Sequence, residues 1–355
     1  MAISTKPGFI YFLREIDTRT GEMTPYVKIG ITRGTRAVEE RIGEHKTSNP
    51  REIHDYRSFQ VTAIDTVETH LHHTFAEDRV EGEWFYLDDK TLDAAIKEAE
   101  RISLKIDEHK TALQTADEAN NKVSIEPERE STKEEMELLD KAIKAGELLK
   151  LAEQKEQLIK TKLLVEMGDS KGIDEIVLIQ ERKSFPSIDK KSLREAHPDI
   201  YAQYVVEKEK LKRSFSLAKR PRSLEKLDPD LDATLKGLNS TEGKSDEPVF
   251  NDPPKERNSL LEDLHFEYLS AMKSTSEAKL EKVLLEAQIK AACGSAKGIS
   301  DVCAWSRELT TGKEFDTSRF KKEHEELARQ FTKQGTPKSP VPLISPRRSY
   351  PVGRR

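Results

Sequence analysis

The chain has 355 residues, enough for two or three domains of ordinary size. Because 35% of the residues are hydrophobic and another 35% are charged, one continuous core over the whole length is excluded. No uncharged apolar run approaches the roughly 20 residues that cross a bilayer, and the net charge of −5 excludes a positive field over the whole surface. We therefore expect a protein without a membrane span, whose contacts with nucleic acid are local.

Residues 1–89 show the clearest succession of strands and helices. The first six residues lack the apolar segment of a secretory signal, which predicts a location inside the cell that makes the protein. The runs 9–13 and 26–31 are rich in aromatic and β-branched residues and flank a polar turn, so both are predicted strands. The pattern that follows predicts a compact domain made of a helix over 37–45, a strand over 56–64, a helix over 65–77 and a closing strand over 83–87.

The segment 90–131 is predicted to be one helix and a linker. Apolar residues at helical spacing occupy one side of 91–101, and the chain from there to Ser131 is polar and poor in aromatic residues. A long amphipathic helix is then expected from Lys133 to Met167, with Gly168 marking its end.

A comparison of the chain with itself predicts an internal repeat. The segment 167–173 is matched by 293–299, both ending in Lys-Gly-Ile, and the segment 188–197 is matched by 315–324. The shared plan is a long amphipathic helix, a glycine-containing turn, a strand-like stretch and a helix capped by Asp189 or Asp316. We expect two mainly helical modules, 132–220 and 259–334, joined by a flexible connector over 221–258; convergent helix caps are the alternative explanation.

The C-terminal part contributes two further expectations. Residues 335–355 carry five prolines and five basic residues without any acidic one, which predicts a disordered, positively charged tail. Cys293 and Cys303 have no second pair to complete a zinc knuckle, so they are predicted to be reduced thiols in a core.

Several motifs of the first quarter of the chain resemble the GIY-YIG nuclease superfamily. In chain order they are Phe9-Ile10-Tyr11, Lys28-Ile29-Gly30, Arg41 with His45, Glu68, and Glu83-Trp84-Phe85. The set is similar to a phage-type branch whose second motif reads Lys-Ile-Gly and whose domain ends in Glu-Trp-Phe. The resemblance implies an α+β domain with a small three-stranded mixed sheet, which cleaves phosphodiester bonds with one divalent metal ion, Mg²⁺ or Mn²⁺.

The resemblance also implies a role for each motif residue. Tyr11 would activate or position the attacking water, Arg41 and His45 would line the phosphate site, and Glu68 would hold the metal. The chemistry of the side chains agrees, because a guanidinium fork suits phosphate and a lone carboxylate leaves most of a Mg²⁺ shell to water and phosphate. Each residue also has an ordinary explanation: a strand tyrosine is often a packing residue, and helix arginines are often solvated.

Lys28 stands where the superfamily usually has a second tyrosine. Either Tyr26, two residues earlier on the same strand face, takes the place of that tyrosine, or Lys28 itself binds phosphate or acts as a base. His72 is expected either to contact Glu68 from the layer of residues behind the metal ligand or to be a further metal ligand itself. A zinc cluster of His70, His72 and His73 is the alternative, although no cysteine is near. Further contacts with phosphate or DNA are expected from Arg33, Arg36, Lys171 and Lys297.

The modules resemble, more loosely, the helical appendage of phage recombination exonucleases of the YqaJ type, whose catalytic motifs are absent here. Residues 1–89 hold 11 basic and 16 acidic residues, so this domain alone is poorly suited to bind DNA. The basic run over 208–222 and the basic tail could supply the missing backbone contacts. The alternative is that the helices pack against each other or against a protein partner.

The sequence therefore predicts a phage-like protein of the host-cell cytoplasm: a Mg²⁺-dependent endonuclease, that is, a DNA hydrolase with repeated, coiled-coil-like helical modules that bind DNA or a partner. The alternative from another class is a non-cleaving nucleic-acid-binding or adaptor protein with a degenerate nuclease fold. A third possibility is a helical assembly protein in which the first domain is only a cap.

Overall fold

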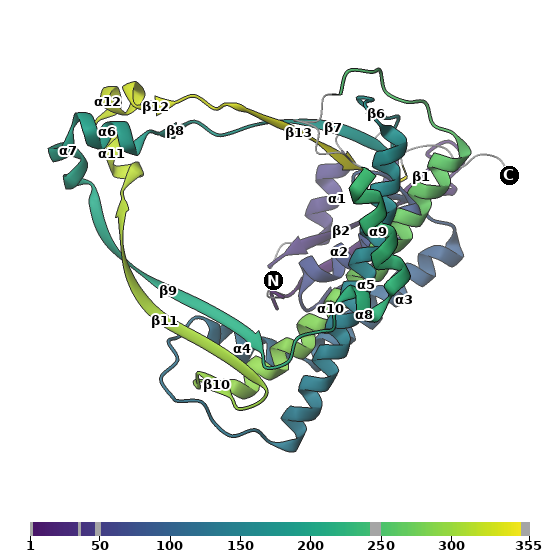
Figure 1. The fold of residues 1–355 in the computed structure, drawn as a ribbon. Coiled ribbons are helices and arrows are strands. Elements are labelled where there is room, and N and C mark those ends of the chain that lie inside the picture. Colours follow the sequence, from purple (N-terminus) through teal and green to yellow (C-terminus); the bar gives the residue numbers. More distant parts are fainter. Residues whose placement is uncertain (1–2, 35–36, 47–50, 242–249, 349–355) are drawn as a thin grey trace.

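An antiparallel sheet organises the N-terminal part of the computed structural model, which describes residues 3–34, 37–46, 51–241 and 250–348 (Figure 1). Its five strands stand in the order β3-β1-β2-β5-β4, and each neighbouring pair is antiparallel. The strands are β1 (Gly8–Ile16), β2 (Met23–Arg33), β3 (Glu52–Val61), β4 (Arg79–Glu81) and β5 (Trp84–Tyr86). The expected three-stranded mixed sheet is wrong, because the short β4–β5 hairpin extends the sheet beyond β2 and no pair is parallel.

Helices cover both faces of this sheet. Ile10 and Phe12 of β1 belong to the larger core, whereas Tyr11 and Leu13 pack on the other face with Val38. Strand β1 is therefore buried on both sides over most of its length, which explains why residues 9–13 are continuously apolar rather than alternating. The covering helices are α1 (Val38–Lys46), α2 (Ile64–Thr74), the 3-10 turn η1 (Ala76–Asp78), α3 (Asp89–Glu108) and α4 (Lys110–Asn120).

The predicted linker over 101–131 is wrong for most of its length. Helix α3 continues to Glu108, and α4 follows almost at once. Leu113 and Ala116 of α4 are buried in the same core as the sheet, together with Leu284 from much later in the chain. Helix α4 has few apolar residues, but these are buried because α10, a helix distant in sequence, packs against them.

Two long helices form the centre of the molecule. They are α5 (Lys133–Met167) and α10 (Ser259–Cys293). Leu139 near the start of α5 packs with Ile289 near the end of α10, and Leu163 packs with Leu261 at the opposite end, so the helices are antiparallel. The predicted bounds of α5 are confirmed: a capping box of Thr132 and Glu135 starts the helix, and Gly168 ends it with a φ of 58° that suits glycine.

The same order of elements follows each long helix. A short strand leads through a turn with positive φ, at Glu175 or Asp301, into a longer strand, and then into two short helices. The first of those helices is capped as predicted, by Asp189 or by Asp316. After α5 come β6 (Gly172–Ile173), β7 (Val177–Lys183), β8 (Ser187–Ile188), α6 (Lys190–Ala196), α7 (Pro198–Gln203) and β9 (Val205–Leu217). After α10 come β10 (Gly298–Ile299), β11 (Cys303–Phe315), α11 (Thr317–Glu323), α12 (Glu325–Gln330), β12 (Thr332–Lys333) and β13 (Pro337–Ile344).

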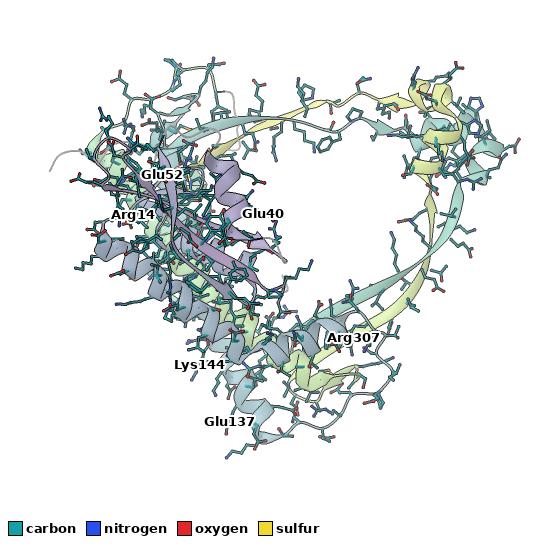
Figure 2. The ribbon with its side chains drawn as sticks, turned by 180° about the vertical axis from the view of Figure 1, so that it is seen from behind. Arg14, Glu40, Glu52, Glu137, Lys144 and Arg307 are labelled. Carbon is teal, nitrogen blue, oxygen red and sulfur yellow. The ribbon has the colours of Figure 1, made fainter. Side chains whose placement is uncertain are left out.

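Each segment has one short internal strand pair, β6 with β7 and β10 with β11, but the longer pairings join one segment to the other. Strand β9 pairs with β11 along its whole length, β13 pairs with β7, and β12 pairs with β8. Helices α6, α7, α11 and α12 share a small aromatic core, which we call the distal cluster, containing Tyr204, Phe315 and Phe320. The helical pair, the two ribbons and the distal cluster form a closed circuit of elements, which we call the frame, and the N-terminal domain lies along the helical pair (Figures 1 and 2).

Two other expectations are corrected. The tail is not wholly disordered, because β13 is a paired strand; residues 349–355 lie outside the described part. The connector over 221–258 contains α8 (Leu224–Leu227) and α9 (Pro229–Thr241), while 242–249 lie outside the described part. Cys293 and Cys303 are buried free thiols, as predicted. Within the described ranges, no helix combines the length and the apolar composition that a membrane span requires.

Candidate active site

Tyr11 lies at the centre of the candidate site, on the sheet face that α1 covers. It is fully buried, and its partner across the β1–β2 pair is Gly30. A Cβ atom on residue 30 would lie 2.5 Å from the Tyr11 hydroxyl oxygen, so the tyrosine ring crosses β2 where only glycine leaves space. The glycine of the Lys-Ile-Gly motif thus has a packing reason.

Arg41 stands beside the Tyr11 hydroxyl group. Burial raises the pKa of Tyr11, and the nearby Arg41 guanidinium offsets part of that rise. The hydroxyl makes no hydrogen bond of regular geometry with any described residue, although it is buried. Arg41 also donates to Glu44 over 2.6 Å. The tyrosine is therefore a neutral hydroxyl next to a cation, able to orient another polar group.

His45 lies one helical turn after Arg41 on α1. Burial lowers its pKa, and the positive charges of Lys28 and Arg41 lower it further, so the imidazole is neutral at pH 7. Its Nε2 atom is buried without a hydrogen-bond partner in the described part of the chain. A neutral histidine with an unused nitrogen can accept a proton.

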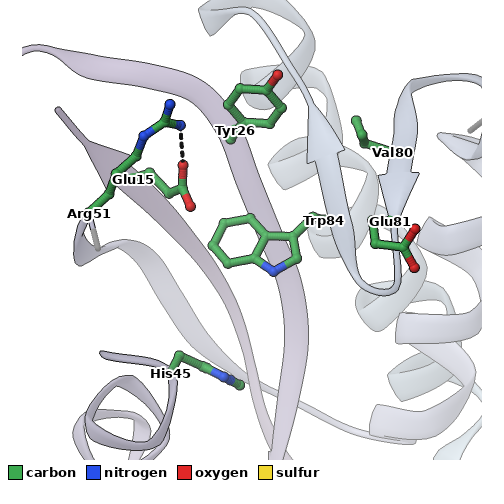
Figure 3. Close-up of a pocket in the computed structure, with 7 residues that line it drawn as sticks. All are labelled: Glu15, Tyr26, His45, Arg51, Val80, Glu81 and Trp84. Carbon is green, nitrogen blue, oxygen red and sulfur yellow. Dashed lines mark hydrogen bonds and ion pairs between the residues drawn. The ribbon is translucent and has the colours of Figure 1, made fainter. Parts of the chain in front are cut away.

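An open pocket of about 370 Å³ leads to His45. In Figure 3 the indole ring of Trp84 is drawn between Tyr26 and His45, and Arg51 is paired with Glu15 over 2.8 Å at the rim. Tyr26 packs edge-on against Tyr86 and lines this pocket. The pocket gives the histidine side of the site access to solvent.

Lys28 is held by a partly buried ion pair with Glu83. Its Nζ atom donates to Glu83 Oε2 over 2.6 Å and lies 5.9 Å from the centre of the Trp84 ring. Burial raises the pKa of Glu83, but the hydrogen bond and charge of Lys28 bring it below the ordinary value. The Lys28 amine is therefore held beside an ionised carboxylate, an arrangement that does not suit action as a free base.

Glu68 of α2 lies near the charged pair of Lys28 and Glu83. Burial raises its pKa to about 7, and the neighbouring carboxylates Glu83 and Asp65 add to that rise, while Arg33 and Lys28 oppose it. Glu83 and Asp65 act on Glu68 through their charges, but each is already paired with a cation, Glu83 with Lys28 and Asp65 with Arg33. Glu68 would therefore supply one carboxylate ligand to a hard divalent cation, which prefers oxygen ligands and takes the rest of its shell from water and phosphate.

The three histidines of α2 do not converge. His72 Nε2 donates to the carbonyl oxygen of Ile29 over 3.1 Å, and burial lowers the pKa of His72 to about 4. Within the described residues His72 makes no hydrogen bond to Glu68. His70 donates to Glu98 over 2.6 Å on the side of α3, so a zinc cluster of His70, His72 and His73 has no geometric basis.

Of the residues predicted to contact phosphate or DNA that the structure describes, Arg33 lies near this site and Lys171 and Lys297 do not. Arg33 is paired with Asp65, next to Glu68 on α2. Arg36 lies outside the described residues. Lys171 and Lys297 follow the ends of α5 and α10, at opposite ends of the antiparallel pair, so the structure does not bring them together.

Glu83 is the site residue that the sequence did not predict. It is paired with Lys28, and its charge acts on Tyr11, His45 and Glu68. The signal was present, because Glu83 opens the Glu-Trp-Phe motif. Its partner is 55 positions away in sequence and becomes visible only when β2 and β5 are paired.

Residues 8–100 match the profile of the T5orf172 domain, which is phage-associated and nuclease-related. The match runs from β1 into α3 and includes the whole candidate site. No curated protein and no solved structure matches the chain significantly. The comparisons lend no support to the resemblance of the later segments to exonuclease appendages.

Proposed function

We propose that the N-terminal domain is a metal-dependent endonuclease of the GIY-YIG type, which hydrolyses phosphodiester bonds of DNA. The observation that supports this most is the meeting of five predicted residues from four elements: Tyr11, Lys28, Arg41, His45 and Glu68. Their charges act on one another although they are spread over nearly 60 positions of sequence. A nuclease-related domain match over the same residues agrees with this function.

The side chains would divide the work as follows. Arg41 and Lys28 would neutralise the phosphoryl oxygens, as cations do in phosphoryl-transfer sites. The hydroxyl group of Tyr11 would orient the attacking water, and neutral His45 would accept its proton at Nε2. Neither atom makes a hydrogen bond of regular geometry within the described residues, although Arg41 stands beside the Tyr11 hydroxyl group, as expected of groups that await a substrate.

Glu68 would hold Mg²⁺ or Mn²⁺, with Glu83 and Asp65 adding negative charge around it. When bound, the ion would stabilise the charge that develops on the phosphoryl oxygens. The raised pKa of Glu68 suits this role, because a cation would relieve the repulsion among the three carboxylates.

The segments that follow α5 and α10 would be two copies of one module that grips DNA or a partner. Support comes from the equal order of elements and the equal length, 35 residues, of α5 and α10. The expected place of action is the cytoplasm of a phage-infected or prophage-bearing cell.

One observation favours a second function, that of a DNA-binding protein that does not cleave. Lys28 stands where a tyrosine is usual in the superfamily, and its amine is already occupied by Glu83. If chemistry needs the missing hydroxyl group, the site would bind phosphate without hydrolysing it.

A plasmid-nicking assay decides between the two functions. The wild type is expected to nick supercoiled plasmid in Mg²⁺ or Mn²⁺, and Glu68→Gln should lower the rate by about 100-fold or more, because charge stabilisation at the scissile phosphate is lost. Glu39→Gln is the matched control, since Glu39 is an exposed glutamate of α1, and it should nick like the wild type. A wild type that shifts DNA on a gel but never nicks it would establish the binder.

A further inference from the structure

Two separate segments of the chain, which we call arcs, each run around the frame from one of the long helices. One arc runs without a break from α5 through β7 and the distal cluster to β9, and the other runs from α10 through β11 and the distal cluster to β13. The arcs pair antiparallel along both ribbons. Near the start of α8, Arg222 returns to α5 and donates twice to Glu147 over 2.9 Å, which closes the first arc on the helix from which it began.

No described element covers the middle of either ribbon. Consecutive residues 207–210 of β9 and 308–313 of β11 are exposed, as are 180–183 of β7. Successive side chains of a strand point to opposite faces, so consecutive exposure means that both faces of the ribbon meet solvent. The inner face of the frame is therefore as accessible as the outer one.

The arcs carry positive charge that the rest of the molecule lacks. Residues 171–222 and 297–348 together hold 24 lysines and arginines against 15 acidic residues, whereas residues 1–89 have an acidic excess. Lys208, Lys210 and Lys212 stand on one face of β9, since they alternate along the strand, and the first two share an ion pair with Glu314 of β11. Such a local basic surface on an otherwise acidic protein is typical of contact with a phosphate backbone.

The sides of the frame are long enough to enclose a nucleic acid. The 35 residues of α5 span about 52 Å at 1.5 Å per residue, and the 13 residues of β9 span about 43 Å. Both lengths exceed the width of a DNA duplex, so the perimeter of the frame is large enough to surround one.

We propose that duplex DNA passes through the frame, so that the protein encircles its substrate rather than binding one side of it. The inference rests on the proposed function for the identity of the ligand, but not on cleavage. Encirclement would hold the N-terminal domain near DNA that this acidic domain would bind poorly alone. It would also let the protein stay on DNA at salt concentrations that dissociate phosphate contacts.

Covalent closure of the first arc tests this topology. In the full chain, Glu147→Cys and Arg222→Cys place two thiols where a salt bridge now joins α5 to the end of the arc, and a short bis-maleimide would link them into a closed ring of 76 residues. Glu68→Gln in the same chain, with EDTA, removes cleavage from the experiment. The protein is bound to linear plasmid, cross-linked, and the plasmid is then ligated into circles before SDS and 1 M NaCl are added.

Ligated circles are expected to retain protein in SDS at least tenfold more than unligated linear plasmid, and cutting the circles should release it. The matched control carries Arg319→Cys and Glu323→Cys, a salt-bridged pair within α11 whose cross-link closes no ring, and it should retain none. The proposal is overturned if fully cross-linked protein leaves circles as readily as linear DNA, or if it binds neither. The tested chain cannot cleave DNA, so its retention on circles does not depend on whether the wild type nicks plasmid. Failure of encirclement and failure of cleavage are therefore distinguishable.

Discussion

Glu68 makes the candidate site sensitive to pH. Its pKa is about 7 in the folded protein, against an ordinary value near 4.5, because burial and two neighbouring carboxylates disfavour its charged form. Below pH 4.5 the group is protonated in both the folded and the unfolded chain. Between pH 4.5 and 7 the folded chain keeps the proton while the unfolded chain loses it. The free energy of unfolding therefore falls as pH rises over this range, and the stability that the proton provides is lost above pH 7.

We expect Glu68→Gln to raise the free energy of unfolding above pH 7 by about 1–3 kcal/mol and to leave it unchanged near pH 4.5. Urea unfolding in EDTA at pH 5 and pH 8 measures this difference. Added Mg²⁺ should stabilise the wild type at pH 8 and not the variant, because the ion binds the charged carboxylate. Equal stability of the two proteins at pH 8 without metal would contradict the burial of this charge.

At the scale of single residues, the resemblance to a nuclease superfamily predicted the members of the site better than their partners. Tyr11, Arg41, His45 and Glu68, which the resemblance put forward, lie close enough for their charges to interact. Glu83 was missed because its role depends on a cross-strand ion pair. His72 illustrates the opposite error: helical spacing placed it one turn from Glu68, but its ring turns to the carbonyl group of Ile29.

Arg307 shows how a single element, β11, is fixed to the long helices. Its side chain is fully buried, and it donates to the carbonyl oxygens of Ala119 and Gly294 over 2.7 Å and to Ser124 Oγ over 2.9 Å. The guanidinium also lies 3.9 Å from the centre of the Trp305 ring. The arginine thus ties the end of α4, the end of α10 and the start of β11 together.

Arg307→Met should lower the free energy of unfolding by about 3–5 kcal/mol, because several buried acceptors lose their donors at once. Arg213, the cross-strand neighbour of Arg307 on β9, provides the control. It is exposed, and its hydrogen bonds within the described part of the chain go to Asn120 and Asn121, so Arg213→Met should cost about 1 kcal/mol or less. Chemical denaturation of both variants measures the contrast, and equal losses would show that burial does not set the cost.

At the scale of elements, the sequence predicted helices well and distant strands poorly. The 35 residues of α5 were predicted because the apolar stripe and the glycine at its end, Gly168, are local signals. Strand β13 was missed because Pro340 and Pro342 argue against a strand, yet β13 is an edge strand that pairs only with β7, where proline is tolerated. Exchange of strands between the two segments leaves no local trace at all.

The N-terminal domain and the helical pair share one core. Leu280, Leu284 and Ala287 of α10 are buried in the same cluster as the sheet and α4, so the predicted boundary at residue 89 does not separate two independent cores. Boundaries read from composition follow changes in polarity along the chain. They cannot show which later helix will cover an apolar face.

Leu284→Ala should therefore loosen the N-terminal domain although it lies on a different segment. We expect a loss of about 2–5 kcal/mol and faster amide exchange in peptides covering 92–116, measured by hydrogen-exchange mass spectrometry. Leu260→Ala, on the same helix but exposed, should change neither quantity. Faster exchange confined to α10 and α5 would mean that the domain is stable without its partner helix.

The pairing of strands between the two segments also determines the order in which they can fold during synthesis. Val177 and Ile344 pair across more than 150 residues, so β7 must wait roughly 8–30 s for its partner at 5–20 residues per second. An unpaired strand is exposed to wrong partners for that time. The outer half of β7, Glu181-Arg182-Lys183, is fully charged, which keeps the waiting edge from pairing with another nascent chain. The second arc of the frame is thus completed late, after the first arc has had time to form and to close on α5 through Arg222 and Glu147.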